Sequence, residues 1–221
     1  MVFSPIAAST FWGPALVIAP LALLWAAWIA PWRQLFGHSY RQHAFLAAVV
    51  CLALLWQLQV NILNVMTLHP LLIMSVVMVF GGALGLWVGA LALLVGLLFR
   101  AQPLPMLAVH FCLGVLVPVL AACLVLQLID RLPVKNLFVY MLGGGFVGGM
   151  LSLQAMAAVS WLYVWLLGPE PLKLIVSDHY YLTLMLIFPE GFLNGSLMSA
   201  LTVLAPDLVK TYDERQYLGD E

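Results

Sequence analysis

The chain has 221 residues, of which 65% are apolar or aromatic and only 8% are charged, and its mean hydropathy is +1.09. Soluble domains carry about 25% charged residues, so a chain this apolar cannot hide its surface in one core and belongs in a bilayer. Eight Lys and Arg against nine Asp and Glu leave a formal net charge of -1 without a basic tract, which excludes a nucleic-acid-binding surface.

Intervals without charged residues mark the segments that can cross a membrane, because a charge at the bilayer centre is costly. One span needs about 20 apolar residues. The intervals therefore predict an all-α polytopic membrane protein with about seven transmembrane helices, within a range of about six to eight. The expected helical segments are 11–31, 43–60, 68–99, 104–129, 136–167 and 180–205.

The apolar segment 68–99 is too long for a single span, so the number of helices depends on where it breaks. As one helix it would be about 46 Å long, well beyond the ~30 Å hydrocarbon core, so we expect a break near Gly81 and Gly82. Gly81, Gly85 and Gly89 also form a small-xxx-small pattern. This pattern fits a single tilted and closely packed helix equally well.

The distribution of Lys and Arg favours seven spans with the N-terminus outside, because basic residues prefer cytoplasmic loops. With seven spans, six basic residues lie inside and two outside. With six spans, four lie on each side. With eight spans, which need a further break at 143–145, five lie inside and three outside. The inside set is Arg33, Arg41, Arg131, Lys135, Lys210 and Arg215, and the outside set is Arg100 and Lys173. We expect residues 1–209 to form a single transmembrane helical domain and 210–221 to form a short charged cytoplasmic tail, and we expect the cell inner membrane as the location.

Polar side chains within predicted spans indicate candidate functional positions, because each needs a partner or a water-filled cavity. Glu190 lies about 16 Å along the last helix from His179, near the middle of the membrane, and Asn194 shares its helix face. We expect both to point into the bundle, either as a site for transport or coupling or as a hydrogen-bonded link between helices. Gly191 and Gly195 form a Gly-xxx-Gly face for close helix contact.

His69 and His110 are the candidate metal ligands. A polar run at 57–69 is expected at the outer membrane interface, where it forms either a hydrated loop or a polar vestibule that ends at His69. A lone histidine such as His110 on an apolar face is more often a satisfied core residue. In the predicted topology, however, both imidazoles lie in the outer half of the bundle, where two neutral imidazoles suit a shared transition metal.

The order of these features resembles the membrane substrate-binding components of energy-coupling-factor transporters for cobalt and nickel, the CbiM and NikM type. The resemblance runs through 12–32, His69 with Pro70, the region of 81–99 and 103–118, and it ends at the Phe-Pro-Glu-Gly sequence of 188–191. It implies seven helices, an outside N-terminus, a divalent metal as substrate, and ATPase and coupling membrane subunits as partners.

The resemblance also implies a set of metal ligands. The family site uses the N-terminal amine, a backbone amide, a histidine at the second position and a histidine in the third-helix region. His69 matches the last of these, whereas Val2 stands at the second position. His110 stands where the family has an asparagine, and it would supply a replacement imidazole. No resident cofactor is expected, since the divalent metal enters as a candidate substrate.

Two functions remain open at this point. The chain has no Walker lysine motif, no Gly-x-Ser-x-Gly and no His-Glu-x-x-His, so we expect no enzymatic activity of its own. The leading hypothesis is a permease component of an energy-coupling-factor-type uptake system that captures a small substrate. The alternative is a non-transporting structural or assembly subunit on the same fold, which Val2 favours and in which Gly81, Gly85 and Gly89 would pack against a partner.

Overall fold

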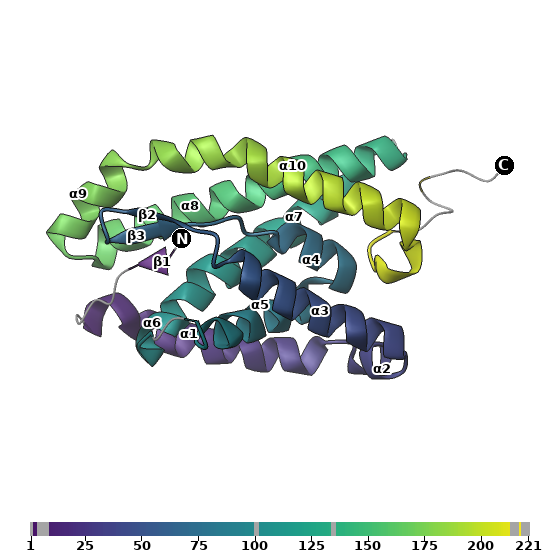
Figure 1. Ribbon diagram of the computed structural model, residues 1–221, viewed down its shortest axis with the longest axis horizontal. Coiled ribbons are helices and arrows are strands. Elements are labelled where there is room, and N and C mark those ends of the chain that lie inside the picture. The colour runs from purple at the N-terminus through teal and green to yellow at the C-terminus, as the bar shows by residue number, and fades with distance from the viewer. Residues whose placement is uncertain (1, 4–8, 100–101, 134–135, 213–216, 218–221) are drawn as a thin grey trace.

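Ten α-helices, two π-helical segments, a short 3-10 helix and three short strands are seen in the computed structural model, which describes residues 2–3, 9–99, 102–133, 136–212 and 217 (Figure 1). The α-helices are α1 (Ser9–Ile29), α2 (Trp32–Phe36), α3 (Ser39–Leu55), α4 (Ile73–Phe80), α5 (Gly82–Gly96), α6 (Leu104–Phe111), α7 (Val117–Asp130), α8 (Gly148–Leu167), α9 (Glu170–Asp178) and α10 (Tyr181–Leu204). The π-helical segment η1 (Cys112–Leu116) joins α6 to α7, and η2 (Val139–Val147) leads into α8. The 3-10 helix η3 (Pro206–Leu208) follows α10.

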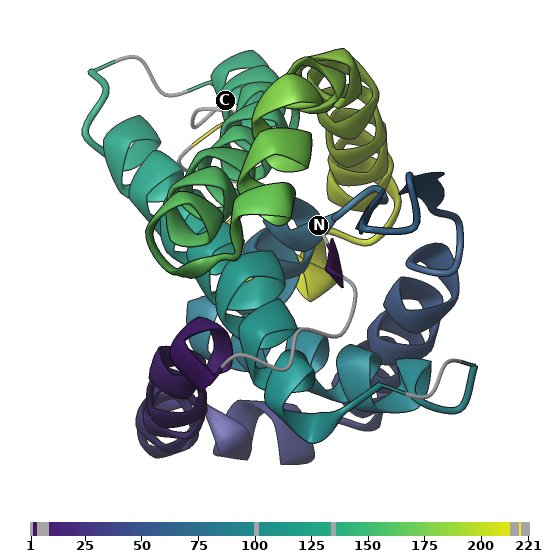
Figure 2. The same ribbon diagram turned by 90° about the vertical axis from the view of Figure 1, so that its left-hand side faces the viewer.

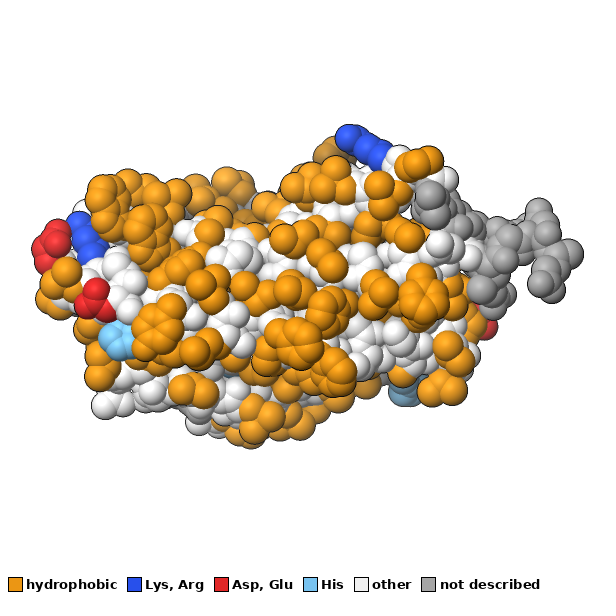
Figure 3. Space-filling model, turned by 90° about the horizontal axis from the view of Figure 1, so that it is seen from above, with side chains coloured by type: hydrophobic (Ala, Val, Ile, Leu, Met, Phe, Trp, Pro, Cys, Tyr) orange, Lys and Arg blue, Asp and Glu red, His pale blue; other side chains and the backbone are white. Residues whose placement is uncertain are grey.

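Four helical stretches of the described chain are long and apolar enough to cross a membrane. They are Ser9–Ile29, Leu104–Asp130, Val139–Leu167 and Tyr181–Leu204. Large apolar side chains also face outward from these stretches, and Trp28 and Leu204 are 86% and 82% exposed. In the space-filling view, hydrophobic side chains cover most of the visible long side of the helical bundle, and the charged side chains lie toward the two ends of the bundle (Figure 3). The chain is therefore a helical membrane protein.

The expected segments 11–31, 104–129, 136–167 and 180–205 are confirmed as continuous helical stretches. The second predicted helix, 43–60, is shifted toward the N-terminus, because α3 begins at Ser39 and ends at Leu55. The short helices α2 and α9 were not predicted. Helix α9 contains Glu170, Lys173 and Asp178, and charges of this kind interrupt an apolar interval without preventing a helix.

The predicted break at Gly81 is confirmed. Gly81 separates α4 from α5 and has a φ of 82°, in the left-handed region that favours glycine. The alternative of one tilted helix through Gly81, Gly85 and Gly89 is therefore wrong. The other proposed break, at 143–145, is absent, because the helical stretch Val139–Leu167 is continuous and widens there into the π-helical η2.

A small sheet at one end of the bundle departs from the expected all-α class. Strands β1 (Val2–Phe3), β2 (Val60–Ile62) and β3 (Met66–Leu68) pair antiparallel in the order β1-β3-β2. Asn64 adopts a φ of 56° in the turn between β2 and β3, a conformation that asparagine tolerates. The polar run 57–69 is therefore largely a hairpin, and β1 adds a third strand to it. When the bundle is viewed from this end, β1 lies near the middle, with helices around it (Figure 2).

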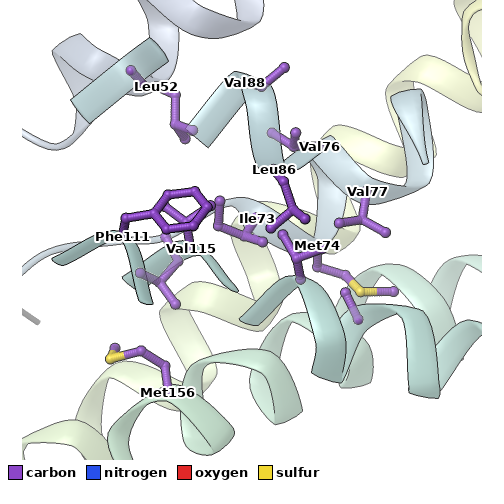
Figure 4. Packing of buried hydrophobic residues seen from close by; sticks show 14 of the residues in the cluster. Leu52, Ile73, Met74, Val76, Val77, Leu86, Val88, Phe111, Val115 and Met156 are labelled. Carbon is purple, nitrogen blue, oxygen red and sulfur yellow. The ribbon is translucent and has the colours of Figure 1, made fainter. Parts of the chain in front are cut away.

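Helix α4 forms the centre of the core. All eight of its residues are buried, and Ile73, Met74 and Val77 lie among side chains of neighbouring helices that include Leu86 and Met156 (Figure 4). At 1.5 Å per residue, α4 is only about 12 Å long. It is a half-length helix inside the bundle, so its first N–H groups need partners that water cannot supply.

Candidate metal-capture site and its support

His69 lies between β3 and α4 and is 6% exposed. Its Nδ1 is 3.0 Å from the Pro70 carbonyl oxygen, and because a carbonyl only accepts, Nδ1 donates and Nε2 carries the lone pair. The Trp56 ring lies 5.5 Å from the imidazole, and Trp56 Nε1 donates to the Leu71 carbonyl oxygen at 3.2 Å. These contacts fix the ring orientation and the tautomer, as partners of metal-binding histidines do.

His110 lies in α6 and is 2% exposed. Its Nε2 accepts a hydrogen bond from the Phe3 backbone N–H at 3.1 Å, so its Nδ1 carries the proton and donates to Gln102 Oε1 at 2.8 Å. Both ring nitrogens thus have protein partners, and the neutral imidazole ties β1 to the bundle. To bind a metal, His110 Nε2 would have to exchange the Phe3 N–H for the ion.

The two histidines line one cavity of about 50 Å³. A water needs about 10–15 Å³ of such space, so the cavity has room for an ion with a few waters. Gln57, Gln59 and Gln102 also line it and supply polar atoms. Among the described residues no group of three or more His, Cys, Asp or Glu side chains is placed to hold a metal, so further ligands would come from backbone, amide or water atoms, or from residues outside that range.

Glu190 accepts hydrogen bonds from the segment that follows His69. The Leu71 N–H donates to Oε2 and the Leu72 N–H donates to Oε1, both at 2.8 Å. The Glu190 side chain is 2% exposed and comes from α10, 119 residues away from Leu71. Because these partners are N–H donors, the geometry suits a carboxylate that accepts, and it links α10 to the start of α4.

Asn194 continues this contact one turn further along α10. Its Oδ1 accepts from the Ser75 N–H at 2.9 Å and from the Ser75 hydroxyl at 2.8 Å, while its Nδ2 donates to Glu190 Oε1 at 2.8 Å. Helix α4 has no side-chain cap from its own N-cap residue, Leu72. Glu190 and Asn194 together therefore cap α4 from another helix, and a carboxylate at a helix N-terminus also favours the helix dipole.

Glycines allow α10 to approach closely enough for this cap. A Cβ added to Gly145 would lie 3.1 Å from Gly195 Cα, and one added to Gly149 would lie 2.9 Å from Asn194 Cβ. A Cβ on Gly191 would lie 2.9 Å from the carbonyl oxygen of Phe146. The Gly-xxx-Gly face of α10 thus packs against glycines of η2 and α8, which is the small-residue crossing typical of membrane helices.

The other glycine series contacts three different segments. A Cβ on Gly81 would lie 3.0 Å from Lys210 Nζ, and one on Gly85 would lie 3.3 Å from Val77 Cγ2 in α4. Gly89 is in close contact with Val115 of η1. The structure does not bring Gly81, Gly85 and Gly89 to one common packing face, and these contacts are within the chain.

The functional residues that the sequence did not indicate are the partners of these side chains: Phe3, Trp56, Gln102 and Ser75. Trp56 and Gln102 stand at the ends of apolar segments, where a polar or aromatic residue is ordinary, and Ser75 is isolated in an apolar run. Only the fold brings them to His69, His110 and Asn194.

A model of the family described as the cobalt uptake substrate-specific transmembrane region matches residues 6–208. The match covers the helical bundle from before α1 to the end of η3 and includes His69, His110 and Glu190. Searches of curated proteins and of solved structures found no significant match. The chain, with its buried histidine pair and its apolar helical bundle, belongs to the family of cobalt-uptake substrate-specific transmembrane components.

Proposed function

We propose that this chain is the membrane substrate-binding component of an energy-coupling-factor-type uptake system and captures a divalent metal ion, first of all cobalt, at His69. The observation that carries the proposal is that His69 and His110 line one ion-sized cavity beside the N-terminal strand. His69 presents Nε2 as the ligand atom, and His110 either supplies a second imidazole or positions β1. Membership of the cobalt-uptake family supports the substrate class.

We further propose seven crossings of the cell inner membrane with the N-terminus outside. The other three crossings would be α3, α5, and a crossing made of the non-helical segment 69–72 followed by α4. Backbone N–H groups of Lys210 and Thr211 donate to the carbonyl oxygens of Val79 and Met78, so the end of α4 and the residues after α10 lie at the same end of the bundle. Arg100, Lys135 and Arg215, which also entered the charge count, lie outside the described residues.

ATP-hydrolysing subunits and a coupling membrane subunit are the proposed partners, because the sequence contains no nucleotide-binding motif and uptake needs an energy source. They would contact the cytoplasmic end that carries Arg41 and Lys210. Of the proposed cytoplasmic tail, 210–212 packs against α4 and Tyr140, while 213–216 and 218–221 lie outside the described residues.

A structural or assembly subunit without transport remains the second candidate function. Val2 stands where the resemblance places a histidine ligand, and both nitrogens of His110 already have protein partners. In that case the cavity would serve packing and hydration only, and the protein would bind no metal.

Metal binding separates the two functions. We expect the purified protein in detergent to bind one ion per chain when tested with Co, Ni, Cu and Zn by calorimetry and metal analysis. His69→Ala should weaken binding by more than the ~10–100-fold typical of losing an outer-shell partner, and His110→Ala, prepared in parallel, tests the second imidazole. His43→Ala is the control, since this exposed histidine in α3 bonds only the nearby Ser39 carbonyl among described contacts. Equal affinity of wild type and His69→Ala would refute the proposed site, and no binding by wild type would favour the assembly subunit.

A further inference from the structure

Two cations lie close together at the end of the bundle away from the sheet. Arg41 in α3 and Lys210 after η3 line a cavity of about 640 Å³ together with His38, Tyr40 and Asp207. The Arg41 guanidinium donates to the backbone carbonyl of Asp207 at 2.9 Å, and within the described chain neither cation forms an ion pair with a carboxylate. Burial and the nearby Arg41 charge lower the pKa of Lys210. An anion held between the two would relieve this repulsion.

An apolar groove lies beside this basic basin. It has a volume of about 440 Å³ and is lined mainly by α3, α4 and α10, and Figure 1 shows α4 between the other two helices. Along α3 its lining runs from Ala44 through Ala47 and Cys51 to Leu55. At 1.5 Å per residue this is about 16 Å, or roughly half of the ~30 Å hydrocarbon core, which is the depth of one leaflet.

The basin and the groove are neighbours. A small cavity of about 10 Å³ is lined both by Arg41 and Lys210, which belong to the basin, and by Phe80 and Leu208, which belong to the groove. A molecule with an anionic head and an apolar tail can therefore place its head in the basin, at the membrane edge, and its tail in the groove, directed toward the membrane centre.

We propose that this site binds one anionic phospholipid, with its phosphate between Arg41 and Lys210 and an acyl chain in the groove. Basic pockets between membrane helices are suited to anionic lipid headgroups. A free phosphate would leave the groove unused, and an apolar helix of a partner protein would fill the groove but bring no counter-charge to the two cations. The bound acyl chain would contact Val76 and Val79 of α4, so it would brace the half-helix whose other end is capped by Glu190 and Asn194.

The headgroup part of the proposal is tested by native mass spectrometry of protein taken from nanodiscs of mixed phosphatidylglycerol and phosphatidylcholine. Wild type should retain one phosphatidylglycerol. The double variant Arg41→Gln/Lys210→Gln should bind it about 25-fold more weakly, at about a factor of five for each basic residue. Arg33→Gln is the control, because this exposed arginine lies outside the basin, and equal retention by both variants would overturn the proposal.

The acyl-chain part is tested separately in the same nanodiscs. Ala47→Phe fills the groove and should reduce lipid retention, whereas Leu46→Phe, on the neighbouring exposed face of α3, should not. Glycerol phosphate added to the detergent-solubilised protein should raise the unfolding temperature much less than phosphatidylglycerol does. An equal rise would assign the basin to a free phosphate ester, and lipid retention unaffected by Ala47→Phe would leave the groove to a partner helix; either result contradicts the lipid site.

Discussion

Replacing Glu190 with alanine should lower the free energy of unfolding by about 2–6 kcal/mol and loosen the segment that carries His69. The substitution leaves the Leu71 and Leu72 N–H groups without their acceptor, and each unsatisfied buried donor costs about 1–3 kcal/mol. Asn194 Nδ2 loses one acceptor as well. Because no water is available inside the bilayer, the chain has no simple replacement for these bonds.

Thermal unfolding in detergent measures the loss of stability, and hydrogen–deuterium exchange over 69–75 measures the local effect. Glu170→Ala is the matched control, because Glu170 is an exposed glutamate that pairs only with Lys173 among described contacts. Glu190→Gln should give a loss of stability between those of wild type and Glu190→Ala. Its amide oxygen still accepts one hydrogen bond, while its NH₂ group faces the other backbone N–H donor. If exchange over 69–75 were the same in Glu190→Ala and Glu170→Ala, the cap of α4 would not depend on Glu190.

The second large effect is expected for Gly149→Ala. The added Cβ would lie 2.9 Å from both Cβ and Nδ2 of Asn194, so Asn194 would have to move away from Ser75. Overpacking of this kind costs about 1–3 kcal/mol, and here it also disturbs the cap. We expect a lower unfolding temperature together with faster exchange of the Ser75 N–H.

Gly13→Ala provides the matched control for this substitution. Nothing lies within 4 Å of a Cβ at Gly13, and alanine within a helix is about 0.5–1 kcal/mol more favourable than glycine. Gly13→Ala should therefore be neutral or slightly stabilising. A Gly149→Ala variant that matched it in both unfolding temperature and exchange would show that the crossing of α8 and α10 tolerates a side chain.

The long helices and the break at Gly81 were predictable because their cause is local. Apolar intervals of sufficient length form spans, and a glycine with a positive φ ends α4 where the interval is too long for one helix. The sheet was not predictable in the same way. Its strands have only two or three residues. Strand β1 also pairs with a strand far away in the sequence, because Val2 lies opposite Thr67 of β3.

In the candidate site, too, local features were predictable from the sequence and contacts between distant segments were not. The i, i+4 spacing of Glu190 and Asn194 predicted a shared face, and both side chains do point at one element, the start of α4. The identity of that element depends on contacts 119 residues apart, which no local pattern encodes. For His110 the sequence suggested a depth in the bundle similar to that of His69, whereas its bonds to Phe3 and Gln102 follow from the sheet and from the loop before α6.

The X-ray absorption spectrum of the cobalt-loaded protein tests most directly whether the chain captures a metal through His69. We predict multiple-scattering features of imidazole around the bound ion in wild type. These features should be reduced in His69→Ala, at equal protein and metal concentrations, and unchanged in the His43→Ala control. A wild-type spectrum identical to that of the His69→Ala sample, or one that shows only hydrated cobalt, would contradict capture at this site.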